Sequence, residues 1–221
     1  MSRKTEKCTE CVPFRSLTNE INSPSSNCNH FHGDRYPKLY INNYIYLQTV
    51  CGGDIIEVGK YNVIADDFQH GKNCKIGHHT CIEKEIVVGD DVTIGNYCDL
   101  YHGIKAGNSV IFQGHIRIAP NCRIGNKVTF KYGTILTTGV LVKDKAFFGP
   151  NSIVLGGLAD RKTKYGTVIG ENVYIGAGTK IAAGTKICED VIIGANSFVN
   201  KDITSSGVYV GNPVKKIRDK L

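Results

Sequence analysis

A six-residue repeat runs through most of this chain and restricts what it can fold into. Counting in steps of six from Val58 to Val154 gives 17 consecutive hexads, and six more run from Ile169 to Val199. Ile, Val or Leu occupies 18 of these 23 first positions, and Gly follows directly in 11 of them. Neither an amphipathic helix nor an ordinary strand keeps this period. Hexapeptide repeats are instead typical of a parallel β-helix, in which short strands stack in coils.

The repeat also predicts which residues stack. Three hexads close one triangular coil, so residues 18 apart should form columns at a spacing of about 4.8 Å. Phe112, Phe130 and Phe148 are the only aromatic first positions, and they are 18 residues apart. We therefore expect one interior ladder of three phenyl rings.

Composition limits the class of protein and its partners. No run of 18 apolar residues exists, so we expect no transmembrane span. The residues after Met1 lack an apolar core, which argues against a secretory signal and favours a cytoplasmic location. Cysteines at interior repeat positions are expected to be buried structural thiols: Cys74, Cys98 and Cys122.

The net charge of +7 suits an anionic ligand. Nucleic acid would leave a basic stripe interleaved with aromatics along one face, whereas the charge here is spread out, with two main concentrations, which fits a phosphate-bearing cofactor better. These contain Arg161, Lys162 and Lys164, then Lys215, Lys216, Arg218 and Lys220.

Four segments are expected. Residues 1–36 form a polar tail, and residues 37–57 form strands that cap the open edge of the first coil. Residues 58–204 form the β-helix, which is interrupted by a protruding loop at 156–168. Residues 205–221 leave through a Pro turn and end as a short helix.

The polar tail offers a weak metal alternative. Cys8, Cys11, Cys28 and His30 could hold a tetrahedral zinc. The second half of this set lacks the usual gap between ligands, so we expect incidental thiols and no required metal.

The hexads, the late loop and the Gly211-Asn212-Pro213 turn together resemble the left-handed β-helix (hexapeptide-repeat) acyltransferases over residues 58–218. The resemblance implies an all-β, left-handed parallel β-helix that forms a homotrimer. It also implies that acetyl-CoA lies between neighbouring subunits and that the loop of one subunit reaches across. Residues 148–151, 160–162 and 164–165 look most like the subgroup that N-acetylates amino sugars on nucleotide carriers.

Residues 154–157 and 175–178 are similar to serine acetyltransferases as well. That family uses an Asp-His pair about 25 residues before its Gly-Gly, and Phe130-Lys131 stands there in this chain. Sugar O-acetyltransferases have a His at the loop entrance, and this loop has none. Both departures weaken O-acetylation.

The columns suggest which residues carry the chemistry. Acyl transfer to an amine needs a proton acceptor and donors for the oxyanion. One column holds His115 and Asn151, and another holds His102 and Thr138 below the loop. These four are the candidates for catalysis. His115 should lie two coils, roughly 10 Å, from Asn151, so with Arg117 it is expected to bind the sugar nucleotide; the alternative for each His is a solvated surface side chain.

The resemblance implies the remaining contacts. Backbone groups of Gly176, Ala177, Ala182 and Ala183 would face the pantetheine arm. Cationic side chains suit the CoA phosphates, and Lys215, Lys216 and Arg218 are candidates, with solvated surface as the alternative. The substrate would meet Arg117, Asp160, Arg161 and Tyr165.

The leading hypothesis is an acetyl-CoA-dependent N-acetyltransferase acting on a nucleotide-linked amino sugar. O-acetylation of a saccharide, an amino acid or a small alcohol is the second. A non-catalytic hexapeptide scaffold is the third, and the loop and tail argue against it. The His spacing does not match the zinc site of γ-type carbonic anhydrases.

Overall fold

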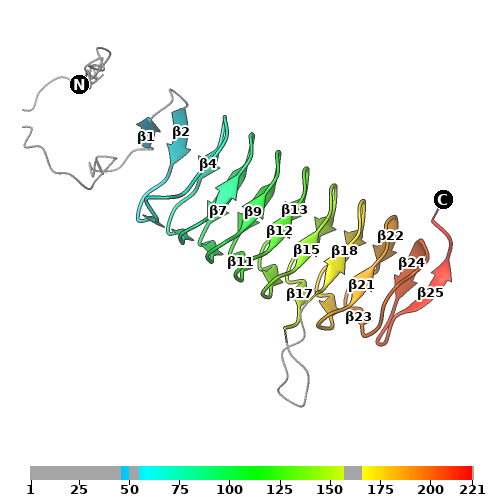
Figure 1. The fold of residues 1–221 in the computed structure, drawn as a ribbon. Helices are drawn as coiled ribbons and strands as arrows, with labels where there is room; N and C mark the ends of the chain where they lie inside the picture. Colours follow the sequence, from blue (N-terminus) through cyan, green and yellow to red (C-terminus); the bar gives the residue numbers. More distant parts are fainter. Residues whose placement is uncertain (1–45, 50–54, 157–165, 221) are drawn as a thin grey trace, which may run out of the picture. The chain divides into compact units, whose positions relative to one another are not determined.

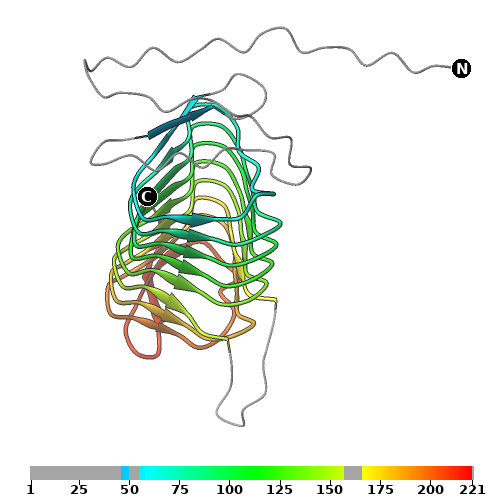
Figure 2. The same ribbon diagram turned by 90° about the vertical axis from the view of Figure 1, so that its left-hand side faces the viewer.

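A computed structural model of the chain describes residues 46–49, 55–156 and 166–220. All of them belong to the unit of residues 35–221. They form a parallel β-solenoid whose coils are three-sided (Figures 1 and 2), as the hexads predict. No helix occurs in this part of the chain.

Three sheets, here called A, B and C, form the sides. Sheet A has 11 strands in the order β1 (Tyr46–Thr49), β2 (Ile55–Val58), β4 (Lys75–Ile76), β7 (Thr93–Asn96), β10 (Ile111–Gly114), β13 (Thr129–Phe130), β16 (Phe147–Phe148), β19 (Tyr174–Ile175), β22 (Val191–Ile193), β24 (Gly207–Val210) and β25 (Lys215–Arg218).

Sheets B and C are shorter. The eight strands of sheet B are β3 (Val63–Ile64), β5 (Cys81–Ile82), β8 (Asp99–Leu100), β11 (Arg117–Ile118), β14 (Ile135–Leu136), β17 (Ile153–Val154), β20 (Lys180–Ile181) and β23 (Phe198–Val199). The six strands of sheet C are β6 (Val87–Val88), β9 (Lys105–Ala106), β12 (Arg123–Ile124), β15 (Leu141–Val142), β18 (Val168–Ile169) and β21 (Lys186–Ile187).

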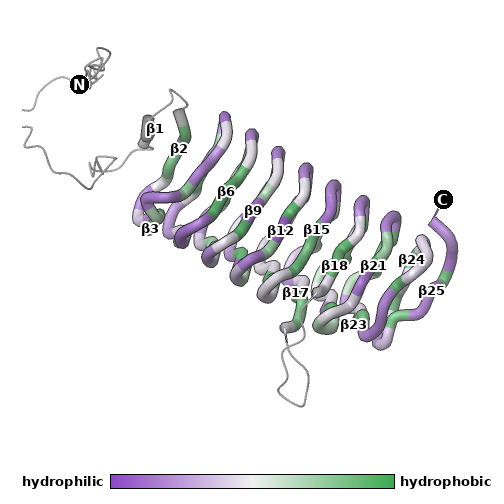
Figure 3. Tube along the Cα trace, viewed as in Figure 1, coloured by the Kyte–Doolittle hydropathy of each residue, from purple (hydrophilic) through white to green (hydrophobic). Residues whose placement is uncertain are grey.

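The strand register confirms the 18-residue columns. Phe112 pairs with Phe130, and Phe130 pairs with Phe148. Their rings lie 5.2 and 4.8 Å apart between centroids, and all three side chains are fully buried. In each strand of the coils the first position of the hexad points inward, and hydrophobic residues concentrate on the strands (Figure 3). Cys74, Cys98 and Cys122 are buried as expected, and burial raises the pKa of Cys98 and of Cys122 to about 11.

Three corners join the sheets. We call them the A–B corner (for example residues 77–80), the B–C corner (83–86) and the C–A corner (89–92). Most corners contain one residue with a positive φ, a backbone conformation that residues other than Gly rarely adopt. The insertion at 157–165 leaves from a B–C corner, between β17 and β18.

Both ends of sheet A are covered by an antiparallel strand. β1 pairs with β2 at one end, and β25 pairs with β24 at the other. The expected C-terminal helix is therefore wrong, because Lys215–Arg218 is a strand. The physical reason is that the last coil has unpaired backbone groups, which a strand can satisfy and a helix cannot.

The other edges of the last coil are also covered by the final residues. Phe198 donates its backbone N–H to Gly211 O at 3.0 Å, and Val214 donates to Phe198 O at 3.0 Å. Ile203 forms a bridge to Ile187. Among the residues that the structure describes, no helix is long and apolar enough to cross a membrane.

Candidate functional site

The outer face of sheet B lies between the two corners that carry the predicted catalytic residues. Its outward row mixes apolar and polar residues, in the order Val63, Cys81, Asp99, Arg117, Ile135, Ile153, Lys180 and Phe198. Asp99 and Arg117 point outward from β8 and β11, and Ile135 and Ile153 follow on β14 and β17. We call this surface, with the A–B and B–C corners beside it, the sheet B face.

A histidine and a carboxylate form a pair at the B–C edge of this face. The Nδ1 atom of His102 lies 3.2 Å from Glu83 Oε2, and the backbone N–H of His102 donates to the same oxygen at 2.9 Å. Both side chains are partly exposed, at 44% for His102 and 38% for Glu83. An ionised carboxylate can only accept, so in neutral His102 the proton belongs on Nδ1. The Nε2 lone pair is then the one that can take a proton from a substrate.

The sequence singled out His102 but missed Glu83. The columns compare residues 18 apart, whereas Glu83 precedes His102 by 19 residues. Glu83 and His102 therefore lie on adjacent coils, but they occupy neighbouring positions of the B–C corner and not the same one. A search for carboxylates at 17 or 19 residues from each His could have found it.

Arg117 lies at the centre of the face, beside an acidic partner. Its Nη2 atom donates to Asp99 Oδ2 at 3.1 Å, and the Arg117 side chain stays 58% exposed. One guanidinium edge is thus held by the protein while other N–H groups remain for an anion.

Cys81 precedes Asp99 in the same outward row. Burial, with smaller contributions from Asp99 and Glu83, raises the pKa of the Cys81 thiol, so it is protonated at neutral pH.

His115 and Asn151 lie on the A–B corner, as the columns predict. His115 stacks on Tyr97 with 4.9 Å between ring centroids. Both His115 and Asn151 are exposed, with positive φ values of 51° and 56°. Gly133 lies between them, and a Cβ atom there would collide with Asn151 Oδ1. The Asn151 side chain therefore reaches back one coil toward His115.

Thr138 lies on the B–C corner, where it is half-buried. It is two coils from His102 along the column, and Gly156 is the next residue of that column, where the described chain stops before the insertion. The structure thus brings His102 and Thr138 to one edge of the sheet B face, and His115 and Asn151 to the other. Asp160, Arg161 and Tyr165 lie outside the described residues, as do Cys8, Cys11, Cys28 and His30.

The predicted pantetheine residues flank β20 on the same face, but they differ in what they offer. Ala177 is exposed and Ala182 is half-buried, so their backbone can be approached from outside. Gly176 is buried, and a Cβ atom there would collide with Ala195 N of the next coil. Coil stacking therefore already requires glycine at 176. Ala183 is buried, at 3% exposure.

The basic residues at the C-terminal end belong to another sheet. Lys215, Lys216 and Arg218 are exposed on β25, at the end of sheet A. Lys216 pairs with Asp219 at 2.7 Å. Within this chain they do not line the sheet B face.

The C–A corner carries a polar network that continues over several coils. Asp90, Asn108, Asn126 and Asp144 each accept the backbone N–H of the residue one coil earlier, at 2.8–2.9 Å. The backbone N–H of Asn126 holds the pKa of Asp144 below its ordinary value.

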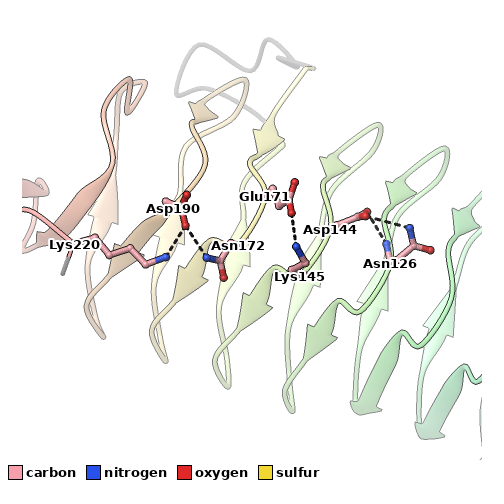
Figure 4. A network of polar contacts seen from close by, with 7 residues as sticks. All are labelled: Asn126, Asp144, Lys145, Glu171, Asn172, Asp190 and Lys220. Carbon is pink, nitrogen blue, oxygen red and sulfur yellow. Dashed lines mark hydrogen bonds and ion pairs between the residues drawn. The ribbon is translucent and has the colours of Figure 1, made fainter.

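The network continues toward the C-terminal end (Figure 4). Lys145 pairs with Glu171 at 2.7 Å, and both Asn172 and Lys220 donate to Asp190 Oδ1. These hydrogen bonds and ion pairs join successive coils along this corner. Among the described residues, no group of three or more His, Cys, Asp or Glu side chains could hold a metal ion.

The fold and its repeat define a hexapeptide-repeat solenoid protein. Residues 166–201 match the family model described as bacterial transferase hexapeptide (six repeats). Residues 166–201 therefore carry the hexapeptide repeat that this model describes.

Two curated relatives match shorter stretches. The chain is 36% identical over 61 residues to the bifunctional protein GlmU of a Nitratiruptor species, which is 27% of this chain and 14% of that protein. It is 34% identical over 67 residues to the serine acetyltransferase of Helicobacter pylori, covering 30% and 39% respectively. The chain thus spans well under half the length of these relatives.

A solved structure of a mutant perosamine N-acetyltransferase from Caulobacter crescentus, in complex with CoA and GDP-perosamine, gives a TM-score of 0.47 at 17% identity. The match covers 73% of this chain and 58% of that chain. At this distance the likeness carries no conclusion about the site.

Proposed function

We propose that the chain is an acetyl-CoA-dependent N-acetyltransferase whose acceptor is an amino sugar on a nucleotide carrier. The hexapeptide repeat and the similarity to a serine acetyltransferase over 67 residues support acyl transfer. The observation that carries the proposal is the Glu83–His102 pair, a proton acceptor oriented at the edge of an open face.

The proposed chemistry is direct transfer. The neutral amine attacks the thioester carbonyl, the new C–N bond forms, and the C–S bond breaks to release CoA. His102 Nε2 takes the proton that the amine loses and returns it to the departing thiolate. Glu83 keeps the ring in the required tautomer and stabilises the imidazolium while it carries that proton.

The proposed path of acetyl-CoA follows the sheet B face. Ala177 and Ala182 lie beside β20, four coils from β8 and His102. Four coils correspond to roughly 20 Å, a length that an extended pantetheine arm can bridge. Thr138 lies between these ends and would contact the arm, while Arg117, His115 and Asn151 would bind the nucleotide part of the acceptor.

The resemblance adds a homotrimer to this proposal. A neighbouring copy would cover the sheet B face and form a cleft, and its loop would supply Asp160, Arg161 and Tyr165. Lys215, Lys216 and Arg218 would then meet the CoA phosphates from a different surface than the pantetheine residues. We expect the enzyme to act in the cytoplasm and to need no metal.

Release of free thiol from acetyl-CoA tests the proposal against a panel of nucleotide-linked amino sugars. Turnover should occur with at least one of them. Binding of no CoA and turnover of no acceptor would instead support a scaffold.

O-acetylation is the second candidate, because the Glu83–His102 pair would serve this reaction as well. A hydroxyl group keeps its proton until it attacks, so it depends on a base more than an amine does. The same panel should therefore include free amino acids, saccharides and small alcohols. Turnover confined to an alcohol would reverse the order of the two candidates.

A further inference from the structure

A column of stacked aromatic rings runs along the A–B corner and ends abruptly. Tyr61, His79, Tyr97 and His115 occupy the same corner position on four successive coils. Neighbouring rings lie 4.9 Å apart between centroids, at interplanar angles of 19°, 1° and 13°. We call these four residues the ring ladder.

The backbone shows that these rings share one geometry. All four residues have φ values between 51° and 60°, a region that large side chains rarely adopt. The next residue of the column, Gly133, has a φ of +72° and no side chain. The corner thus keeps its backbone conformation while the ring is missing.

One face of His115 is therefore left without a stacked ring. Tyr97 covers its other face, and no described residue supplies a ring on the Gly133 side. The ring centroids of the ladder are 4.9 Å apart, which is within the range of offset stacking. A planar ring bound at the next position would continue the ladder at the same spacing.

The groups around the missing ring are suited to a nucleotide. Asn151 carries a carboxamide that reaches toward Gly133, and a carboxamide can pair with the donors and acceptors on the edge of a base. Arg117 is 58% exposed and lies two residues after His115. Its free N–H groups suit a phosphate.

Tyr132 forms a side of the same position. It is 52% exposed, and a Cβ atom on Gly114 would lie 2.7 Å from its Cε1 atom. The ring therefore packs over Gly114, beside His115. An aromatic face and an amide thus lie beside the gap, and Arg117 lies on the adjacent strand β11 with one guanidinium N–H bonded to Asp99 of the preceding coil.

We propose that the gap at Gly133 is a subsite for the base of a nucleotide, which stacks on His115 and continues the ring ladder. Asn151 pairs with the edge of the base, and Arg117 binds a phosphate. This inference rests on the proposed function only for the source of the base, which is the nucleotide carrier of the acceptor.

The most direct test fills the gap with a ring of the protein's own. In Gly133→Tyr the new ring would occupy the proposed subsite, and the column already accepts Tyr at two positions. The new Cβ would meet only the end of the Asn151 side chain, which can rotate away. Ser109→Tyr is the matched control, because Ser109 has a φ of 56° on the C–A corner, away from the sheet B face.

Calorimetric titration with UMP, dTMP, GMP and adenosine 3′,5′-bisphosphate provides the readout. The wild type should bind at least one of them, and Gly133→Tyr should weaken that binding about tenfold or more, as loss of one stacked base does. Ser109→Tyr should bind as the wild type does. The mononucleotide that binds identifies the carrier, whereas binding of the bisphosphate alone would place the CoA adenine here and contradict both the subsite for the carrier's base and the proposed path of acetyl-CoA.

A second variant covers the case in which Gly133→Tyr does not fold. His115→Ala removes the stacking face and should weaken the same nucleotide at least several-fold while Tm stays within a few degrees. Equal affinity in the wild type and both folded variants overturns the subsite, as does failure of the wild type to bind any of the four nucleotides. Acetyl-CoA turnover in the latter case would leave the proposed function standing, so the two failures are distinguishable.

Discussion

The C–A corner and the sheet B face are built on the same coils, yet the side chains of His102 and Arg117 on the face are held differently from the side-chain oxygens of the C–A corner. At the C–A corner, each side-chain oxygen from Asp90 to Asp144 accepts a backbone N–H of the preceding coil. On the sheet B face, His102 and Arg117 are each held on one side only. A repeat fold thus separates groups that join its coils from groups that remain available to a ligand.

Replacing the proton acceptor should give the largest effect. We expect His102→Ala to lower kcat by about 10²- to 10⁴-fold, as loss of a general base does, with Tm nearly unchanged because the side chain is partly exposed. Thiol release from acetyl-CoA measures the rate. A kcat within threefold of the wild type would remove His102 from the chemistry.

Gly176→Ala should separate the structural from the ligand-binding role of that residue. The added Cβ collides with the backbone of the next coil, so unfolding in urea should show a loss of about 1–3 kcal/mol. Ala182→Gly, at a half-buried position, is the comparison and should cost less. Unchanged stability with a raised KM for acetyl-CoA would show that Gly176 serves the ligand instead.

Breaking the C–A corner should affect stability without affecting activity. Asn126 accepts the backbone N–H of Asn108 and donates to Asp144 Oδ2. Asn126→Ala should lower the free energy of unfolding by about 1 kcal/mol, with kcat and KM as in the wild type. If activity falls as far as it does in His102→Ala, the contrast between the two regions is wrong.

Acid should weaken the same corner, with the smallest effect. The side chain of Lys220 lowers the pKa of Asp190, and the backbone N–H of Asn126 lowers that of Asp144, both from an ordinary value of 3.8. The stabilisation is therefore complete above about pH 4 and is lost as pH falls through the lower, folded-state pKa values. Thermal melts between pH 6 and 2 should show this loss, and Asp190→Asn should reduce it slightly. A melt as acid-sensitive in Asp190→Asn as in the wild type would exclude Asp190 as a contributor.

The coils could be predicted from the sequence because the first position of each hexad points into the core and has to suit it. The columns of Phe112, Phe130 and Phe148, and of Tyr97 and His115, follow from counting alone. Prediction failed at Lys215–Arg218, where no repeat applies and where the need to cover the last coil decides the conformation.

The site was predicted only in part. His102 and Thr138, like His115 and Asn151, were brought to shared edges as expected. The partner Glu83 was missed because it precedes His102 by 19 residues, and counting in steps of 18 does not detect such a pair. Contacts that depend on a second copy of the chain have no signature in the column pattern.

A crystal structure of the protein with CoA tests the central claim most directly. The account predicts that the pantetheine arm runs along the outer face of sheet B, from Ala177 and Ala182 toward His102, with the thiol near His102 Nε2. CoA bound at the C–A corner, or no CoA bound at saturating concentration, would contradict it.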